Sequence, residues 1–150
     1  MIVLFLTLFA CKEEVEPNGV YQVTVTGLES DCTDDNAGYQ ETFNYRLFYE
    51  GSAAEIYIDD KLFAIGEQRG CFLEYETQSY LEENGDGGFQ WQIVGGADVQ
   101  AAAGGCEDIP EGSDWFGEEF LYVDPSDTIG LEDGCTYKME VSGKLVQEEE

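Results

Sequence analysis

Apolar and polar residues alternate with a period of two along most of this chain of 150 residues. Tyr21, Val23 and Val25, for example, are separated by the polar residues Gln22 and Thr24. A period of two places successive side chains on opposite faces of a β-strand, so each strand can bury one face and expose the other. We therefore predict strands at 20–28, 41–49, 55–58, 62–66, 71–81, 89–94, 116–124 and 135–145.

Short links rich in turn residues separate these segments. Asp59-Asp60-Lys61 predicts a hairpin turn, and the glycine-rich segment 84–88 predicts another. No segment combines a period of 3.6 with helix caps, and the glycine-rich segment 95–105 is expected to be a strand end, a bulge and a loop. The predicted fold class is all-β: a single antiparallel domain of about eight strands, either a lipocalin-like up-and-down barrel or a two-sheet sandwich.

The chain begins with ten largely apolar residues that are followed directly by Cys11. This run is too short to cross a bilayer, which takes about 20 residues, but it suits a secretory signal peptide and its cleavage site. Leu8-Phe9-Ala10-Cys11 resembles the lipobox of bacterial lipoproteins, which has Leu three residues before the cysteine and a small residue immediately before it. The resemblance implies that signal peptidase II cleaves before Cys11 and that fatty acyl chains such as palmitate are attached to this cysteine.

The same resemblance implies a domain organisation and a location. Residues 1–10 are expected to be the signal peptide, 11–18 the lipidated cysteine and a polar tether, 19–147 the all-β domain and 148–150 an acidic tail. Lys12 stands where lipoproteins retained at the inner membrane carry Asp, so the resemblance implies anchoring in the bacterial cell envelope, at the outer membrane. Two or three acyl chains are enough for stable attachment to a membrane.

Four cysteines remain when Cys11 is set aside: Cys32, Cys71, Cys106 and Cys135. An even set in an exported protein favours two disulfides, and three pairings are open to four cysteines. A zinc site is disfavoured because the chain has no histidine and no closely paired cysteines. If the strands close into a barrel, the first strand pairs with the last, which favours Cys32–Cys135 and leaves Cys71–Cys106.

The charge balance restricts the partners of this protein. The chain has 33 Asp and Glu against 6 Lys and Arg, for a net charge of −27. This charge opposes the binding of nucleic acid, which depends on clustered basic residues, and it opposes contact with anionic lipid headgroups. Membrane contact is therefore expected through the lipid anchor only.

Enzymatic chemistry has little support in the sequence. With no histidine, the Ser/His/Asp and Cys/His nucleophile systems cannot form. No cofactor motif is present, and no cofactor is expected. A carboxylate-based hydrolase stays open as a less favoured alternative, because it requires two carboxyl groups at a fixed separation and the sequence cannot place such a pair.

Acidic loops offer weak calcium candidates, because Ca²⁺ binds oxygen ligands. The segment 82–87 has calcium-loop spacing, but Ile93 stands where such a loop requires Glu. Solvated surface is the favoured interpretation of these loops, so no metal site is predicted. The other candidate residues are Asp124, Asp127, Glu132 and Asp133, and the loop 107–114.

Aromatic residues recur on the predicted inward faces. They can fill the core, which is the favoured interpretation, or they can line a cavity for a small amphipathic molecule. The sequence therefore predicts a non-enzymatic binding or interaction module for an unknown protein or small molecule, with a lipocalin-like carrier of a small hydrophobic ligand as the alternative. The residues concerned are Tyr21, Tyr45, Tyr49, Tyr75, Trp91 and Tyr137.

Overall fold

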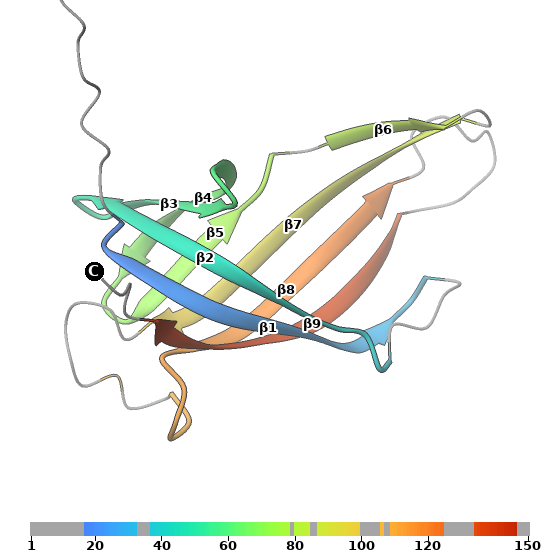
Figure 1. Cartoon of the computed structure of the whole chain (residues 1–150). Helices are drawn as coiled ribbons and strands as arrows, with labels where there is room; N and C mark the ends of the chain where they lie inside the picture. The colour runs from blue at the N-terminus through green and yellow to red at the C-terminus, as the bar shows by residue number, and fades with distance from the viewer. Residues whose placement is uncertain are drawn as a thin grey trace, which may run out of the picture.

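The protein is a closed antiparallel up-and-down β-barrel (Figure 1). The computed structural model describes residues 17–32, 37–78, 80–84, 87–99, 106, 109–124 and 134–146. The predicted all-β fold class is confirmed. Of the two predicted architectures, the structure is the barrel and not the two-sheet sandwich. The strands are β1 (Gly19–Ser30), β2 (Gln40–Glu50), β3 (Ala53–Ile58), β4 (Lys61–Arg69), β5 (Phe72–Glu76), β6 (Tyr80–Asn84), β7 (Gly87–Val99), β8 (Trp115–Asp124) and β9 (Cys135–Val146).

Two pairings close the barrel. The first strand β1 pairs with the last strand β9, and β5 pairs with β7. Strands β5 and β6 lie one after the other along the same edge of β7, so together they form one of the eight strands of the barrel. Each remaining strand pairs with its neighbour in the sequence, which explains why short turns suffice for most links.

Thr77 marks the break between β5 and β6, where the sequence predicted one continuous strand over 71–81. Its backbone N–H donates to the carbonyl of Ile93 at 2.9 Å, and its Oγ1 accepts the Ile93 N–H at 3.0 Å. The Thr77 hydroxyl oxygen takes the place that a backbone carbonyl would have between paired strands. Hydrogen bonding to β7 therefore continues across the break, with one side-chain acceptor in place of a backbone acceptor.

Strand β7 is longer than the sequence predicted, because it extends through Gly95 and Gly96 to Val99. A Cβ at Gly95 would lie 2.5 Å from the ring of Tyr75, and a Cβ at Gly96 would lie 2.5 Å from the ring of Phe72. Tyr75 is buried inside the barrel and Phe72 is exposed outside it. The glycines are therefore sites where rings from β5 cover both faces of β7, and they do not end the strand as predicted.

The expected hairpin turn between β3 and β4 is present. Asp59 and Asp60 have φ angles of 53° and 64°. Positive φ at both central residues is typical of the two-residue turns that match the twist of a hairpin.

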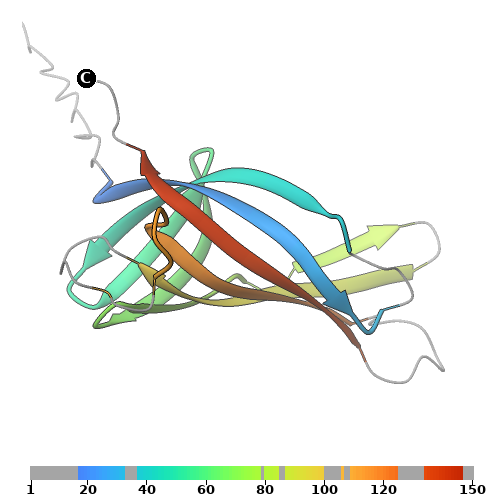
Figure 2. The same ribbon diagram turned by 90° about the horizontal axis from the view of Figure 1, so that it is seen from below.

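One half of the barrel interior is filled with side chains. We call it the packed half; it lies where β1 begins and β9 ends, with Val20 opposite Val146 (Figure 2). The Trp115 ring is fully buried there, with ring centres of Tyr21, Tyr45 and Tyr75 at 5.3, 5.5 and 5.8 Å. The core of this half also contains Val23, Leu47, Ala54, Leu73, Ala97, Val99 and Val141.

Both disulfides of the structure match the favoured pairing. Cys71–Cys106 lies at the packed end, directly before β5, and Cys32–Cys135 lies at the opposite end, where β9 begins. Disulfides of this kind persist in oxidising compartments, which indicates an extracytoplasmic protein. Among the residues described, there is no helix with the length and apolar character needed to cross a membrane.

Candidate functional site

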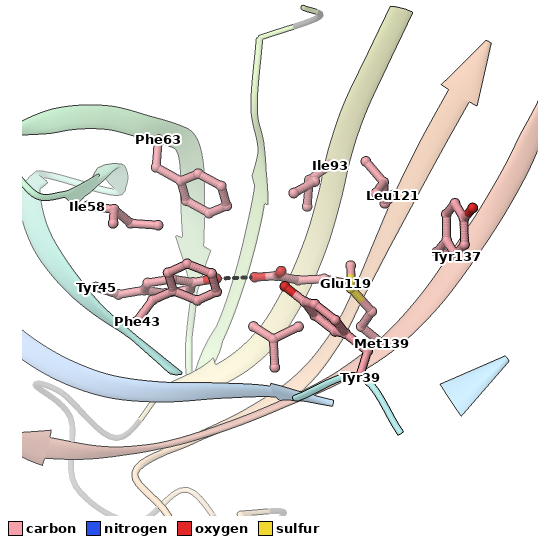
Figure 3. A pocket seen from close by; sticks show the side chains of 11 residues that line it. Tyr39, Phe43, Tyr45, Ile58, Phe63, Ile93, Glu119, Leu121, Tyr137 and Met139 are labelled. Carbon is pink, nitrogen blue, oxygen red and sulfur yellow. Dashed lines mark hydrogen bonds between the residues drawn. The ribbon is translucent and has the colours of Figure 1, made fainter. Parts of the chain in front are cut away.

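The half of the barrel opposite the packed half contains a cavity of about 590 Å³. We call this region the hollow half. The cavity opens toward solvent beside Tyr39, whose side chain is 44 % exposed. It is lined almost entirely by apolar and aromatic side chains (Figure 3): Val25, Tyr39, Phe43, Tyr45, Ile58, Phe63, Ile93, Glu119, Leu121, Tyr137 and Met139.

Glu119 on β8 is the charged group of this site, and only 1 % of it is exposed. Its Oε1 accepts hydrogen bonds from the hydroxyls of Tyr45 at 2.8 Å and Tyr75 at 2.6 Å (Figure 3 shows the first). Its Oε2 accepts no hydrogen bond from a described residue. Glu119 lines the cavity, so Oε2 is the carboxyl oxygen left to accept a donor from a ligand there.

The strand register explains how Tyr75 reaches Glu119. Gly95 on β7 stands between them, opposite Tyr75 on one side and opposite Glu119 on the other. A Cβ at this position would come within 2.8 Å of the Tyr75 hydroxyl oxygen. The glycine thus allows the tyrosine ring to lie across β7 and to place its hydroxyl on the carboxyl group.

Tyr45 approaches Glu119 from β2, three strands away around the barrel. The hydrogen bonds of Tyr45, Glu119 and Tyr75 therefore cross the barrel interior. Both tyrosine rings also pack against Trp115 on the side of the packed half. We call these three residues the polar layer, because they form the boundary between the packed half and the floor of the cavity.

Burial determines the electrostatics of the polar layer. Desolvation raises the pKa of Glu119, and the two tyrosine hydrogen bonds oppose this rise. Desolvation, together with the nearby Glu119 carboxyl, raises the pKa of both Tyr45 and Tyr75. The two hydroxyls therefore keep their protons at neutral pH and act as donors to Glu119.

Aromatic rings form one wall above the polar layer. The Tyr45 ring centre lies 5.4 Å from that of Phe63 and 6.5 Å from that of Phe43. At the rim, Tyr39 donates its hydroxyl to Glu41, and burial together with this hydrogen bond raises the pKa of Tyr39 to about 12. The cavity thus combines aromatic surface with one buried carboxyl group.

The structure assigns different roles to the aromatic residues that the sequence predicted to face inward. Tyr21 and Tyr75 are in the core, Tyr45 belongs to both core and cavity, and Tyr137 lines the cavity. Tyr49 is half-buried and packs against the core, whereas Trp91 is half-buried without lining the cavity. Core and cavity were treated as alternatives from the sequence, and the barrel contains both.

Several candidate residues fall outside the part of the chain that the structure describes. These are Cys11, Asp127, Glu132 and Asp133, together with the side chain of Asp124. In the acidic loop before β8, Asp114 Oδ2 accepts the backbone N–H of Leu145 at 2.9 Å. Asp31, Cys32 and Cys135 come close together, but both sulfur atoms belong to the disulfide and offer no thiolate to a metal.

Sequence reasoning missed Glu119 and Trp115. Glu119 is one of 33 acidic residues, and nothing in its immediate neighbours distinguishes it from the exposed ones. The available signal was the period of two on β8, which places Glu119 on the same face as Trp115 and Leu121. Comparison with protein-family models, curated proteins and solved structures gave no match for this chain. The function is therefore inferred from the geometry of the cavity.

Proposed function

We propose that this protein is a lipid-anchored, extracytoplasmic, non-enzymatic binding protein that holds a small, largely apolar molecule in the cavity of its barrel. The observation that carries the proposal is the cavity of about 590 Å³ with largely apolar and aromatic walls and a single carboxyl group, Glu119, at its floor. Small-molecule sites typically have volumes of about 300–1,000 Å³, apolar walls and few polar groups. Eight-stranded barrels are wide enough to hold one small ligand.

The start of β1 is compatible with the anchored arrangement. Strand β1 begins at Gly19 in the packed half, so the preceding residues join the barrel at the end opposite the cavity mouth. A lipid on Cys11 would leave the mouth facing away from the membrane. The ligand would then enter from the aqueous side or from a partner.

A hydrolytic role has less support. Carboxylate-based hydrolysis uses two carboxyl groups, one as acid and one as base or nucleophile. Glu119 is the single carboxyl group among the described residues that line the cavity. One carboxyl group in a largely apolar cavity favours binding over catalysis.

Binding of N-phenyl-1-naphthylamine tests the proposed function. This neutral dye becomes fluorescent in apolar surroundings, and we expect saturable binding with one dye per protein. Leu121→Trp should weaken binding by narrowing the cavity, whereas Tyr122→Trp, at the next and outward-facing position, should leave it unchanged. Equal binding by both variants, or no binding by the unmodified protein, would contradict the proposal.

The lipid anchor is tested separately. Radiolabelled palmitate should enter the unmodified protein in a bacterial host and should not enter Cys11→Ser. Equal labelling of the two proteins would refute acylation at Cys11.

A further inference from the structure

We propose that the molecule held in the cavity is a small organic cation: a protonated amine with an apolar body, whose ammonium group binds Glu119 Oε2 at the cavity floor. This inference rests on the proposed function, because it specifies the ligand class of the same cavity. Four features of the site support it, and each concerns a different part of the interaction.

The first feature is a buried carboxyl group that has no cation beside it. Among the described residues, Arg46 pairs with Asp60, Arg69 pairs with Glu67, and Lys138 lies near Glu29 and Glu118. None of the described basic residues lines the cavity. A buried carboxylate is strongly stabilised by a partner cation, and here the ligand is the group that can supply one.

The second feature is that the two oxygens of Glu119 differ in their hydrogen bonds. Oε1 already accepts two hydroxyl donors, which fix the orientation of the carboxyl group and favour its charged form. Oε2 accepts no hydrogen bond from a described residue, and Glu119 lines the cavity, so a ligand can supply the donor. An ammonium group has N–H donors and a positive charge, so it forms the charge-assisted hydrogen bond that is stronger than a neutral one.

The third feature is the aromatic wall. The rings of Phe43, Tyr45 and Phe63 form one side of the cavity, and Glu119 lies on the other side (Figure 3). A cation near the face of an aromatic ring is attracted by the ring quadrupole, and this attraction strengthens when water is excluded. The wall therefore accommodates both the apolar body and the charge of an amine.

The fourth feature is the net charge of −27. A field of this sign concentrates cations around the protein and repels anions, which speeds the association of a cationic ligand. It acts against fatty acids and other carboxylates, which would also meet Glu119 at the floor. The net negative charge of the protein and the Glu119 carboxyl group thus both favour a positively charged ligand.

Three ligands with the same body test the inference: tryptamine as cation, tryptophol as neutral alcohol and indole-3-propionate as anion. Each is titrated against the protein with bound N-phenyl-1-naphthylamine at neutral pH. We expect tryptamine to bind at least about tenfold more tightly than tryptophol, and indole-3-propionate to bind most weakly. In Glu119→Gln tryptamine should bind no more tightly than tryptophol, because Gln keeps the oxygen that accepts from the tyrosines but carries no negative charge.

Glu118→Gln is the matched control. It removes one negative charge at the neighbouring, outward-facing position and leaves the cavity floor intact. The preference for tryptamine should survive in this variant. An equal loss in both variants would assign the preference to the general field and would overturn a specific role of Glu119.

Proton release gives a second measurement that needs no variant. A cation beside Glu119 stabilises the carboxylate, so tryptamine should displace a proton from Glu119 into solvent under conditions where the free carboxyl is protonated. Calorimetry at mildly acidic pH in two buffers of different ionisation enthalpy should detect this release for tryptamine and not for tryptophol. Dye binding without any preference for tryptamine would overturn the cation inference and leave the proposed function standing, whereas absence of dye binding would overturn the proposed function itself.

Discussion

The two halves of the barrel share most of their strands, yet only one of them is filled. In the packed half, the rings of Tyr21 and Trp115 point toward the barrel axis and meet. Further along the same two strands, Val25 and Leu121 occupy the corresponding inward positions and leave a cavity. The interior of an eight-stranded barrel is just wide enough for side chains to fill it, so the exchange of large rings for shorter side chains is sufficient to open a site.

The polar layer separates these two functions of the interior. On one side, buried rings and aliphatic side chains supply the hydrophobic stabilisation of the fold. On the other side, fewer side-chain contacts are made, and the cavity walls are available to a ligand. Variants in the packed half and in the hollow half should therefore differ in their effects on stability and on ligand binding.

The largest expected effect is the loss of the central ring. Trp115→Ala should reduce the free energy of unfolding by about 3–5 kcal/mol, because it leaves a large void among three tyrosines. Phe63→Ala in the hollow half should cost roughly half as much or less, because this side chain already borders the cavity. Urea unfolding monitored by circular dichroism measures both. Equal losses would show that the two halves contribute alike to stability.

Trp115→Phe serves as a control for the first comparison. The Trp115 indole N–H is buried and makes no hydrogen bond of good geometry to a described residue, although it lies close enough to the Tyr75 hydroxyl to oppose the rise in the pKa of Tyr75. Phe keeps an aromatic ring and removes this donor, so the loss should be much smaller than that of Trp115→Ala.

The two disulfides should differ in their effect on binding more than in their effect on stability. Replacing either cysteine pair by alanine should cost about 2–5 kcal/mol, because each bridge restricts the unfolded chain. The pair Cys32–Cys135 lies at the end with the cavity mouth, whereas Cys71–Cys106 lies at the packed end. Only loss of the first pair should weaken dye binding. Equal weakening by both would mean that the barrel responds as a single unit.

Added volume should be tolerated in one half and not in the other. Val141→Phe should reduce the free energy of unfolding by about 1–3 kcal/mol, because the packed half has no space for the larger ring. Leu121→Phe adds volume toward the cavity and should leave stability unchanged or slightly increased. Thermal unfolding of the two variants decides between these outcomes. A destabilised Leu121→Phe would indicate that the cavity is smaller in solution.

The smallest expected effect is a pH dependence that arises in the polar layer. Burial raises the pKa of Glu119 above its ordinary value of 4.5, so the folded protein binds this proton more tightly than the unfolded chain. The stability that Glu119 contributes is therefore complete below about pH 4.5 and is lost as pH rises through the folded pKa. Each tenfold difference in proton affinity between the folded and unfolded chain corresponds to about 1.4 kcal/mol.

Urea unfolding across this pH range, with Glu119→Gln as reference, measures that contribution. The unmodified protein should lose stability relative to Glu119→Gln as pH rises, because Gln carries no ionisable group. An unmodified protein that keeps the same stability difference from Glu119→Gln across this range would contradict the assignment of the pH dependence to Glu119.

The period-two pattern was sufficient to predict the fold class and the approximate strand positions. It did not separate barrel from sandwich, because both bury one face of every strand. It also failed on β7, where glycine usually weakens a strand but here admits the rings of Tyr75 and Phe72. A local pattern contains no information about which side chain of another strand will cover a glycine.

The candidate site was harder to predict than the fold. On β8, Phe116, Phe120 and Tyr122 are apolar residues on the face opposite Trp115 and Leu121, so hydrophobicity alone does not show which face is inside. The position of Glu119 depends on that choice of face. Its contact with Tyr45 joins residues 74 positions apart in the sequence, and only the closed barrel brings them together.

The pairing of β1 with β9 also determines when the molecule can become complete. Val20 pairs with Val146, so the pairing of β1 with β9 cannot form until the last dozen or so described residues of the chain are present. Before these residues are available, β1 and β8 each present an open edge, and open edges of this kind favour aggregation. Contacts between such distant residues also form slowly. The barrel and the Cys32–Cys135 bridge can therefore form only after the C-terminal strand has been made.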